Sequence, residues 1–370
     1  MTELADVFHQ YGERYRNRYG QRILPSHQSV MQAIVQCRTE QLGGCIYHCP
    51  GCDQTHYSYH SCQNRHCPKC QANSGQAWLE RQQTLLLPTP YFLLTFTVPD
   101  ALRSLMRAHQ KQLYNLLFRS SAAAAQQLAR DPKWVGGKIG MVGVLHTWGR
   151  NLIYHPHTHY LVPAGGVTPA GTWQATTHNF FLPVKALSRI FRAKFRDALR
   201  QTEWFDDIPA SVWQREWVVH CKPVGDGVAA LKYLAPYIFR VAISNRRILK
   251  VANDKVTFRF RRSDTGQWRT CTLDALEFIR RFLQHVLPKG FVKVRYYGLL
   301  SPSHRHLLAA ARQALSGPTT SPTETAPTAE MALTKANVTG QRSECSSPCP
   351  SCGHEMRLVQ RLKPRSRCPP

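Results

Sequence analysis

Acidic residues are scarce in this 370-residue chain: 22 Asp and Glu stand against 48 Lys and Arg. The formal net charge is +26, and 17 histidines add to it below neutral pH. A charge of this size repels itself unless a polyanion offsets it. Nucleic acid is the expected partner, because no polybasic amphipathic helix or lipidation motif points to an anionic membrane.

Long apolar runs are also missing. No stretch reaches the roughly 18 residues of a membrane-spanning helix, and the most apolar segment, 84–99, is interrupted by Pro and Thr. The N-terminus carries acids from the start and no apolar core, so we expect that it is not a secretory signal. No internal repeat and no G-x-x-x-x-G-K-[ST] motif is present, so we expect no helicase motor. The expected location is the cytoplasm.

Composition and periodicity divide the chain into four predicted segments. These are a cysteine-rich N-terminal segment, a mixed helix and strand segment, a linker rich in Pro, Thr, Ala and Ser, and a short cysteine-containing tail, at 1–86, 87–315, 316–343 and 344–370. Strands are predicted at 91–98, 138–149, 157–166, 216–224, 255–262 and 291–300. The main helices are predicted at 1–35, 71–86, 101–130, 184–201, 227–242 and 273–285. Pro156 predicts that the third strand begins near His157.

Two C-x-x-C turns within 22 residues predict a zinc site. They are Cys49-Pro50-Gly51-Cys52 and Cys67-Pro68-Lys69-Cys70, with 14 residues between them. Such turns let two thiolates reach one tetrahedral ion, and a small loop-rich segment of this kind gains folding energy from the metal. The interpretation is one structural site of Cys49, Cys52, Cys67 and Cys70.

Other cysteines and histidines leave alternatives open. A second site, or an exchange of ligands with the first, is possible for Cys37, Cys45, His48, Cys62 and His66. In the tail, Cys349-x-x-Cys352 together with Cys345 and Cys368 could form a small zinc ribbon. Basic residues and tyrosines near the first cysteines favour contact with nucleic acid: Arg38, Arg65, Lys69, Tyr47, Tyr57 and Tyr59.

Three histidines alternate in "HPHTHY", residues 155–160. In a strand, His155, His157 and His159 share one face. A lone histidine there is most often a core residue, whereas several in register converge on a point, as metal ligands must. The Asp-His continuation of metallo-β-lactamase-like hydrolases is missing from this motif.

Tyr233 and Tyr237 stand four residues apart on the helix predicted at 227–242, so they share one side of it. They could simply be core aromatics. Joined to a histidine metal pair in a basic chain, they suggest nucleophiles: a tyrosine hydroxyl can attack a phosphodiester when a divalent ion stabilises charge on the phosphate. The product is a 5′-phosphotyrosyl DNA link with a free 3′-hydroxyl. Pro236 removes a helical hydrogen bond and puts the aim of Tyr237 in question.

Several blocks resemble a known family. "CRTEQLGG", "CPGC", "SCQNRHCPKCQ", "LHTWGRNLIYHPHTHYLVPAGG", "WVVHCKP", "KYLAPYIFRVAISNRRI" and "VRYYGLL" look like successive blocks of IS91-like rolling-circle insertion-sequence transposases, members of the HUH endonuclease superfamily. The resemblance covers roughly residues 10–315. It implies an α+β fold: a small zinc-binding domain, then a catalytic domain with a central antiparallel sheet flanked by helices.

The resemblance also implies roles for individual residues. His157 and His159 would be paired ligands of Mg²⁺ or Mn²⁺, with Thr158 at a usually hydrophobic position between them. Tyr233 and Tyr237 would alternate in cleaving and rejoining single-stranded DNA at transposon ends and target. His146 is the candidate third ligand and His155 the second choice, while Arg246 and Arg247 are candidate phosphate contacts. Such a protein would be nucleoid-associated when bound to DNA.

Two alternatives stay open. A rolling-circle replication initiator or relaxase would share the same chemistry, although the zinc segment and the family blocks favour transposition. A zinc-dependent nucleic-acid-binding protein without catalysis would use its histidines and tyrosines only as core.

Overall fold

The computed structural model describes residues 2–70, 78–149, 151–176, 180–239, 242–262, 265–316 and 348–365. The chain forms two compact units, one of residues 1–35 and 64–317 and one of residues 36–63 and 318–370. This division cuts across the predicted segment 1–86. The predicted linker at 316–343 lies almost wholly outside the described residues. No helix in the described part of the chain is long and apolar enough to cross a membrane.

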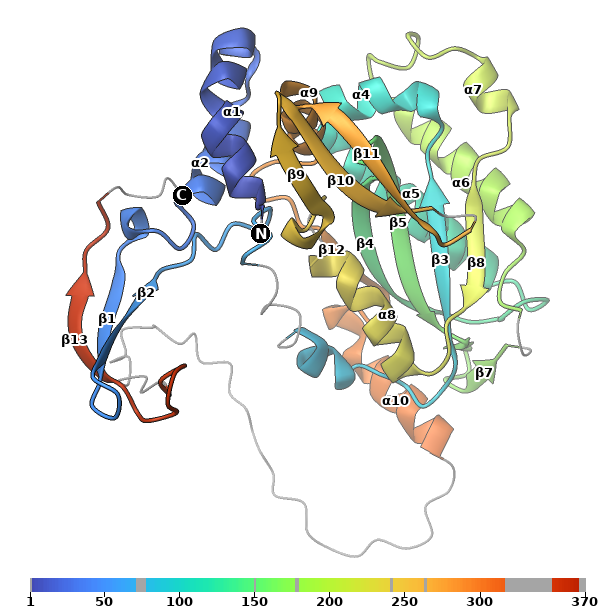
Figure 1. Cartoon of the computed structure of the whole chain (residues 1–370). Helices are drawn as coiled ribbons and strands as arrows, with labels where there is room; N and C mark the ends of the chain where they lie inside the picture. The colour runs from blue at the N-terminus through green and yellow to red at the C-terminus, as the bar shows by residue number, and fades with distance from the viewer. Residues whose placement is uncertain are drawn as a thin grey trace, which may run out of the picture. The chain divides into compact units, whose positions relative to one another are not determined.

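The larger unit is organised around a five-stranded sheet (Figure 1). Its strand order is β12-β4-β5-β3-β8, and every neighbouring pair is antiparallel. The bounds are Tyr91–Thr97 for β3, Gly140–Trp148 for β4, Tyr154–Pro163 for β5, Val219–Pro223 for β8 and Val294–Gly298 for β12. The central antiparallel sheet expected from the sequence is therefore confirmed.

Helices cover both faces of this sheet (Figure 1). On one face, α5 (Gln110–Ala129) and α6 (Val184–Leu199) pack against Leu94, Phe96 and Tyr160. On the other, α8 (Gly227–Phe239) and α10 (Arg305–Ser316) pack against the alternate residues, including Leu93, Val142, Val144 and Leu161. Because side chains of a strand alternate, the central strands are apolar on both faces, as for a sheet buried between layers.

The strand β5 begins at Tyr154, so the predicted start near His157 is wrong. Pro156 is accommodated because the pairing with β3 ends at His157 and the ladder to β4 shifts register between His146 and Trp148. A bulge of this kind leaves a residue without its usual ladder bond, which a proline nitrogen cannot make.

The remaining elements of the larger unit surround this sheet. Helices are α1 (Leu4–Tyr19), α2 (Pro25–Gln36), α4 (Arg103–Ala108), α7 (Ser211–Gln214) and α9 (Ala275–Leu283), and residues 78–83 are also helical. Short strands β6 (Gly165–Val167) and β7 (Trp173–Ala175) pair with each other, and β9 (Ile248–Ala252), β10 (Lys255–Arg261) and β11 (Trp268–Asp274) form a three-stranded sheet. The helix α9 begins where the Asp274 carboxylate accepts hydrogen bonds from the amides of Leu276 and Glu277, a standard N-cap.

The smaller unit is a three-stranded antiparallel sheet of order β13-β1-β2. Its strands are Gly44–Cys49 (β1), Gln54–Tyr59 (β2) and Arg357–Leu362 (β13). The tail predicted only as a possible ribbon thus supplies one edge strand of this sheet.

A buried histidine in the larger unit makes its stability depend on pH. The His285 ring bonds the Thr147 hydroxyl through Nδ1 at 3.3 Å and the Leu152 carbonyl through Nε2 at 3.2 Å. Burial lowers the pKa of His285 to about 4. Between pH 6.5 and pH 4, His285 therefore binds a proton in the unfolded chain but stays neutral in the folded chain. The free energy of unfolding falls as the pH falls through this range.

We expect this group to lower the free energy of unfolding by about 2 kcal/mol between pH 7 and pH 5. Urea unfolding at both pH values would measure it, with His285→Gln as the comparison. The pH dependence of the variant should be smaller by that amount, and equal pH dependence of the two proteins would contradict the prediction.

Candidate active site and cysteine clusters

Three histidines meet on one face of the central sheet. His146 lies on β4, and His157 and His159 lie on β5; one nitrogen from each lies within 4.8 Å of the others. The register places His146 opposite His157, and Val144 opposite His159. Cross-strand partners point to the same face, and Val144 packs in the cluster that includes α8 residues. The three imidazoles are therefore on the α8 side of the sheet.

Hydrogen bonds select which ring nitrogen faces the cluster. His157 Nδ1 lies 2.6 Å from the His155 carbonyl, which can only accept, so this nitrogen carries the proton. His159 Nδ1 lies 3.0 Å from the Thr95 hydroxyl on β3. Protein ligands of metal ions are usually oriented in this way, with one ring nitrogen bonded to an oxygen and the other directed at the ion. Nε2 is thus the ligating atom expected of both.

Burial keeps these rings neutral. It lowers the pKa of His157 to about 4 and that of His159 well below its usual value. A neutral imidazole has the lone pair that a metal requires. The group contains three nitrogen ligands and no carboxylate, so it fits a divalent ion that keeps open positions for oxygen ligands of a substrate.

The structure separates the two candidates for third ligand. His146 belongs to the cluster, is 3% exposed and stacks on Trp148 with ring centroids 4.8 Å apart. His155 instead bonds Arg103 Nη2 through Nδ1 at 2.8 Å. The contact of His155 with the site is made by its backbone carbonyl, which accepts the hydrogen bond from His157 Nδ1.

Thr158, between the paired histidines, faces away from them. Its hydroxyl lies 3.4 Å from that of Ser121 on α5. Ser121 also bonds the Tyr160 hydroxyl at 2.7 Å. The polar residue at this position is accommodated by a polar partner in the α5 layer.

The helix α8 carries Tyr233 and Tyr237 and continues through Pro236. The side chains of residues 233–237 lie outside the described part of the structure. The helix packs against β3, β4 and β5, with Ala230, Leu231 and Ile238 buried. The Lys293 amino group donates to the Ile238 carbonyl at 3.0 Å, in the last turn of the helix, where carbonyl groups need partners outside it.

Two residues beside the site were not singled out from the sequence. His220 and Lys222 are exposed on edge strand β8, where His220 pairs with Thr95 and Lys222 with Leu93. They share the histidine face, and the charge of Lys222 contributes, after burial, to the lowered pKa of His159. Side chains alternate between the two faces of a strand, so the sequence "VHCKP" could have placed His220 and Lys222 on one face once the pairing of β8 with β3 was known.

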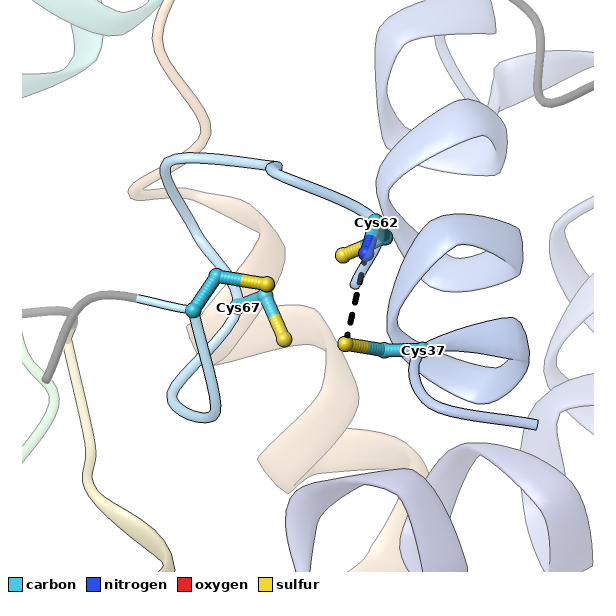
Figure 2. Close-up of side chains that lie close together, drawn as sticks. Cys37, Cys62 and Cys67 are labelled. Atoms are coloured by element: carbon cyan, nitrogen blue, oxygen red, sulfur yellow. Dashed lines mark hydrogen bonds between the residues drawn. The ribbon is translucent and has the colours of Figure 1, made fainter. Parts of the chain in front are cut away.

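The sulfur atoms of Cys37, Cys62, Cys67 and Cys70 lie within 4.8 Å of one another. Figure 2 shows Cys37, Cys62 and Cys67 with their sulfurs turned toward the same small space. The Cys62 amide lies 3.5 Å from the Cys37 sulfur. Four thiols at this spacing fit a tetrahedral zinc ion.

A second group of Cys49, Cys52, Cys349 and Cys352 is equally compact. The predicted site of Cys49, Cys52, Cys67 and Cys70 is therefore corrected: its two turns belong to different groups. Cys49 and Cys52 lie at the turn of the β1–β2 hairpin, whereas Cys37 and Cys62 flank its open end. Five residues of strand separate these ends by roughly 17 Å, too far for one ion.

The other nominated residues have different roles. His66 Nε2 accepts from the Leu287 amide at 3.3 Å, and His48 faces Asp53 at 3.5 Å. Cys45 is in neither cysteine group, and Cys345 and Cys368 lie outside the described residues.

Several of the nominated basic residues bind within the fold. Arg65 donates to the carbonyls of Phe291 and Pro288, and Lys69 pairs with Glu3 at 2.6 Å. Arg247 donates to the Arg259 carbonyl, while Arg246 is exposed.

Comparison with known proteins gives two family matches. Residues 7–98 match the family "Transposase zinc-binding domain", and residues 140–307 match the family "Putative transposase". "Putative transposase y4qJ" of Sinorhizobium fredii is 39% identical over 96% of this chain and 94% of its own length. "Transposase for insertion sequence element IS801" of Pseudomonas savastanoi pv. phaseolicola is 31% identical over 72% of this chain and 68% of its own. No solved structure matches the chain.

Replacing His146 should weaken metal binding at the histidine site. We expect His146→Ala to lower Mn²⁺ affinity by roughly tenfold or more, because one of three ligands is lost. Titration of Mn²⁺ followed by electron paramagnetic resonance would measure it. His155→Ala is the matched control, since its ring bonds Arg103 and the variant keeps the carbonyl that orients His157. Equal loss in both variants would contradict the assignment.

Proposed function

Because the chain belongs to the IS91-like insertion-sequence transposases with an N-terminal zinc-binding domain, we propose that it moves DNA by cutting and rejoining single strands. In this proposal Tyr233 and Tyr237 are the nucleophiles and His146, His157 and His159 hold the divalent ion. The substrates are single-stranded ends of the element and a single-stranded target.

One observation carries this proposal: the histidine group and the helix with both tyrosines lie on the same face of one sheet. The helix α8 packs on β3, β4 and β5, the strands that supply the histidines and the Thr95 hydroxyl. Tyr233 and Tyr237 follow buried Ala230 by three and seven residues, a spacing that returns to one side of a helix. If both groups were merely core, no such convergence would be required.

The chemistry is a phosphoryl transfer between oxygens. The tyrosine oxygen forms a bond to phosphorus, the bond to the 3′-oxygen breaks, the phenol loses its proton and the 3′-oxygen gains one. The phosphotyrosine keeps the bond energy, so a 3′-hydroxyl can attack it and restore the DNA and the tyrosine. Two tyrosines allow one strand to be held while another is cut.

The bound ion supplies electrostatic stabilisation of the phosphate oxygens as charge develops. Three imidazoles favour a softer divalent ion than Mg²⁺, which prefers oxygen ligands. We therefore expect Mn²⁺ to support the reaction at lower concentration than Mg²⁺. Exposed Lys222, on the same face of the sheet, is placed to neutralise phosphate.

The outer face of the β9–β11 sheet offers a further contact for DNA. Cross-strand pairing brings Thr257 opposite both Lys250 and Thr272, and Arg261 opposite Trp268. Trp268 is 57% exposed, and the Arg259 guanidinium lies over its ring at 4.9 Å. Cations interleaved with an exposed aromatic ring suit single-stranded nucleic acid, whose bases stack and whose phosphates attract cations. Arg246 and Arg247 immediately precede β9.

The alternative without catalysis predicts metal-independent DNA binding and no covalent product. A replication initiator or relaxase would give the same covalent product, but the family to which this chain belongs favours transposition.

We expect wild-type protein with Mn²⁺ to form a covalent adduct on end-labelled single-stranded DNA from the termini of its element. Tyr233→Phe/Tyr237→Phe should reduce the adduct below roughly one per cent, because the nucleophilic oxygens are gone. A denaturing gel scores it. Tyr296→Phe is the control, since its hydroxyl is already bonded to the Gln82 side chain. Binding without adduct in the wild type would favour the alternative without catalysis.

Removing two cations from the β9–β11 face should weaken DNA binding through charge. For Lys250→Ala/Arg259→Ala we expect the slope of log affinity against log salt concentration to become less steep by about 2, because about two phosphate contacts are lost. Fluorescence anisotropy at several salt concentrations measures this. Arg14→Ala is the control because Asp254 already offsets its charge at 2.7 Å; an equal change there would argue against a localised surface.

A further inference from the structure

We propose that Cys49, Cys52, Cys349 and Cys352 form a structural zinc site that fastens the C-terminal end of the chain to the β1–β2 hairpin. All four residues belong to the smaller unit. The family match to a zinc-binding domain ends at residue 98, so half of these ligands lie outside it. The proposal concerns folding and does not depend on DNA cleavage.

The sulfur positions fit a tetrahedral ion. Cys49 and Cys352 sulfurs are 3.4 Å apart, and those of Cys52 and Cys349 are 3.6 Å apart. Zinc-sulfur bonds of about 2.3 Å at tetrahedral angles require sulfurs about 3.8 Å apart. A disulfide would require about 2 Å. All four sulfurs lie within 4.8 Å of one another, so the spacing suits four thiolates on one ion.

The two C-P-x-C turns also have matching backbone conformations. Each is followed by a residue with positive φ: Asp53 at 55° and Gly353 at 78°. In the second turn, the Gly353 amide donates to the Cys349 carbonyl at 2.9 Å and the Cys349 amide to the His354 carbonyl at 2.7 Å. The turns approach closely, since a Cβ on Gly51 would lie 2.6 Å from the His354 ring. Glycine permits this contact.

In the described part of the smaller unit, few apolar side chains are buried. Its buried cluster consists of Cys49, Cys349 and Met356, with Tyr47 and Cys52 packed against it. Two of three buried members are therefore cysteines. A unit with so few apolar side chains does not gain enough free energy from burial to fold, and a bound metal is the usual substitute.

Other contacts attach the tail to the β1–β2 hairpin. The strand β13 pairs with β1 from Gly44 opposite Leu362 to His48 opposite Arg357. The Arg365 guanidinium pairs with Glu40 at 2.9 Å, and the Ser351 hydroxyl donates to the Gln54 side chain at 2.7 Å.

A histidine supports the sulfur group from outside. His56 Nε2 lies 3.3 Å from the Cys349 sulfur. A ring N–H at this position can donate to a thiolate, as outer groups around metal-bound sulfur commonly do.

The site has a consequence for the whole chain: residues near its C-terminus complete a unit that begins near its N-terminus. A chain ending before residue 348 would carry Cys49 and Cys52 with no partners for a four-cysteine site. Only a chain that includes Cys349 and Cys352 would hold both zinc ions.

Zinc content tests the proposal. By mass spectrometry of purified full-length protein, Cys349→Ser/Cys352→Ser should hold one zinc per chain fewer than wild type. Cys37→Ser/Cys62→Ser should also lose one, from the other group. Cys45→Ser, on the same strand as Cys49 but outside both groups, should lose none. Equal zinc content in Cys349→Ser/Cys352→Ser and wild type would overturn the proposal.

A second measurement uses the wild-type protein, so it does not depend on whether a variant folds. Cys352 is exposed in the structure, and an exposed thiol reacts readily with iodoacetamide unless a metal holds it. In native wild-type protein Cys352 should react more slowly than partly buried Cys45, and a chelator should reverse the order. Fast alkylation of Cys352 before chelation would overturn the site, while leaving the proposed nuclease activity untouched.

Discussion

The antiparallel register of β4, β5 and β3 is the constraint on which the site depends. It aligns His146 with His157, and Thr95 with His159. A slip of one residue would turn the histidines into the α5 layer. That layer holds Tyr160, whose hydroxyl bonds Ser121 and the Phe118 carbonyl, so the apolar and polar contacts of the opposite face fix the register. Packing on the α5 face of the sheet thereby positions the three histidines on the opposite face.

Metal and sulfur take the place of an apolar core in the smaller unit. The larger unit stacks helices on both faces of its sheet, whereas among the residues that the structure describes the three-stranded sheet has a small buried cluster. Cys49 and Cys52 lie at the turn of the β1–β2 hairpin, and Cys37 and Cys62 flank its open end. This arrangement explains why C-x-x-C turns adjacent in sequence do not share one ion.

Charge is distributed in a way that suits a polyanion. The histidine group contains no carboxylate; after burial, Lys222 also lowers the pKa of its member His159, and Arg103 bonds the neighbouring His155. In the proposed reaction, the scissile phosphate would bring the negative charge that three neutral imidazole ligands lack. The β9–β11 face adds cations and an exposed indole. The scarcity of acidic residues is thus seen at two particular places, the histidine group and the β9–β11 face, as well as in the net charge.

The sequence by itself determined the alternating histidines, the tyrosine spacing, the strands that carry the site and the paired cysteine turns, because these depend on local periodicity. It also indicated the family through its motif blocks. Only the tertiary structure decided that His146 and not His155 joins the pair, that Pro156 lies within a strand, and that Cys49 and Cys52 meet Cys349 and Cys352. These outcomes depend on strand pairing, which for β1 and β13 joins segments at nearly opposite ends of the sequence, and spacing along a chain carries no information about which distant strands pair.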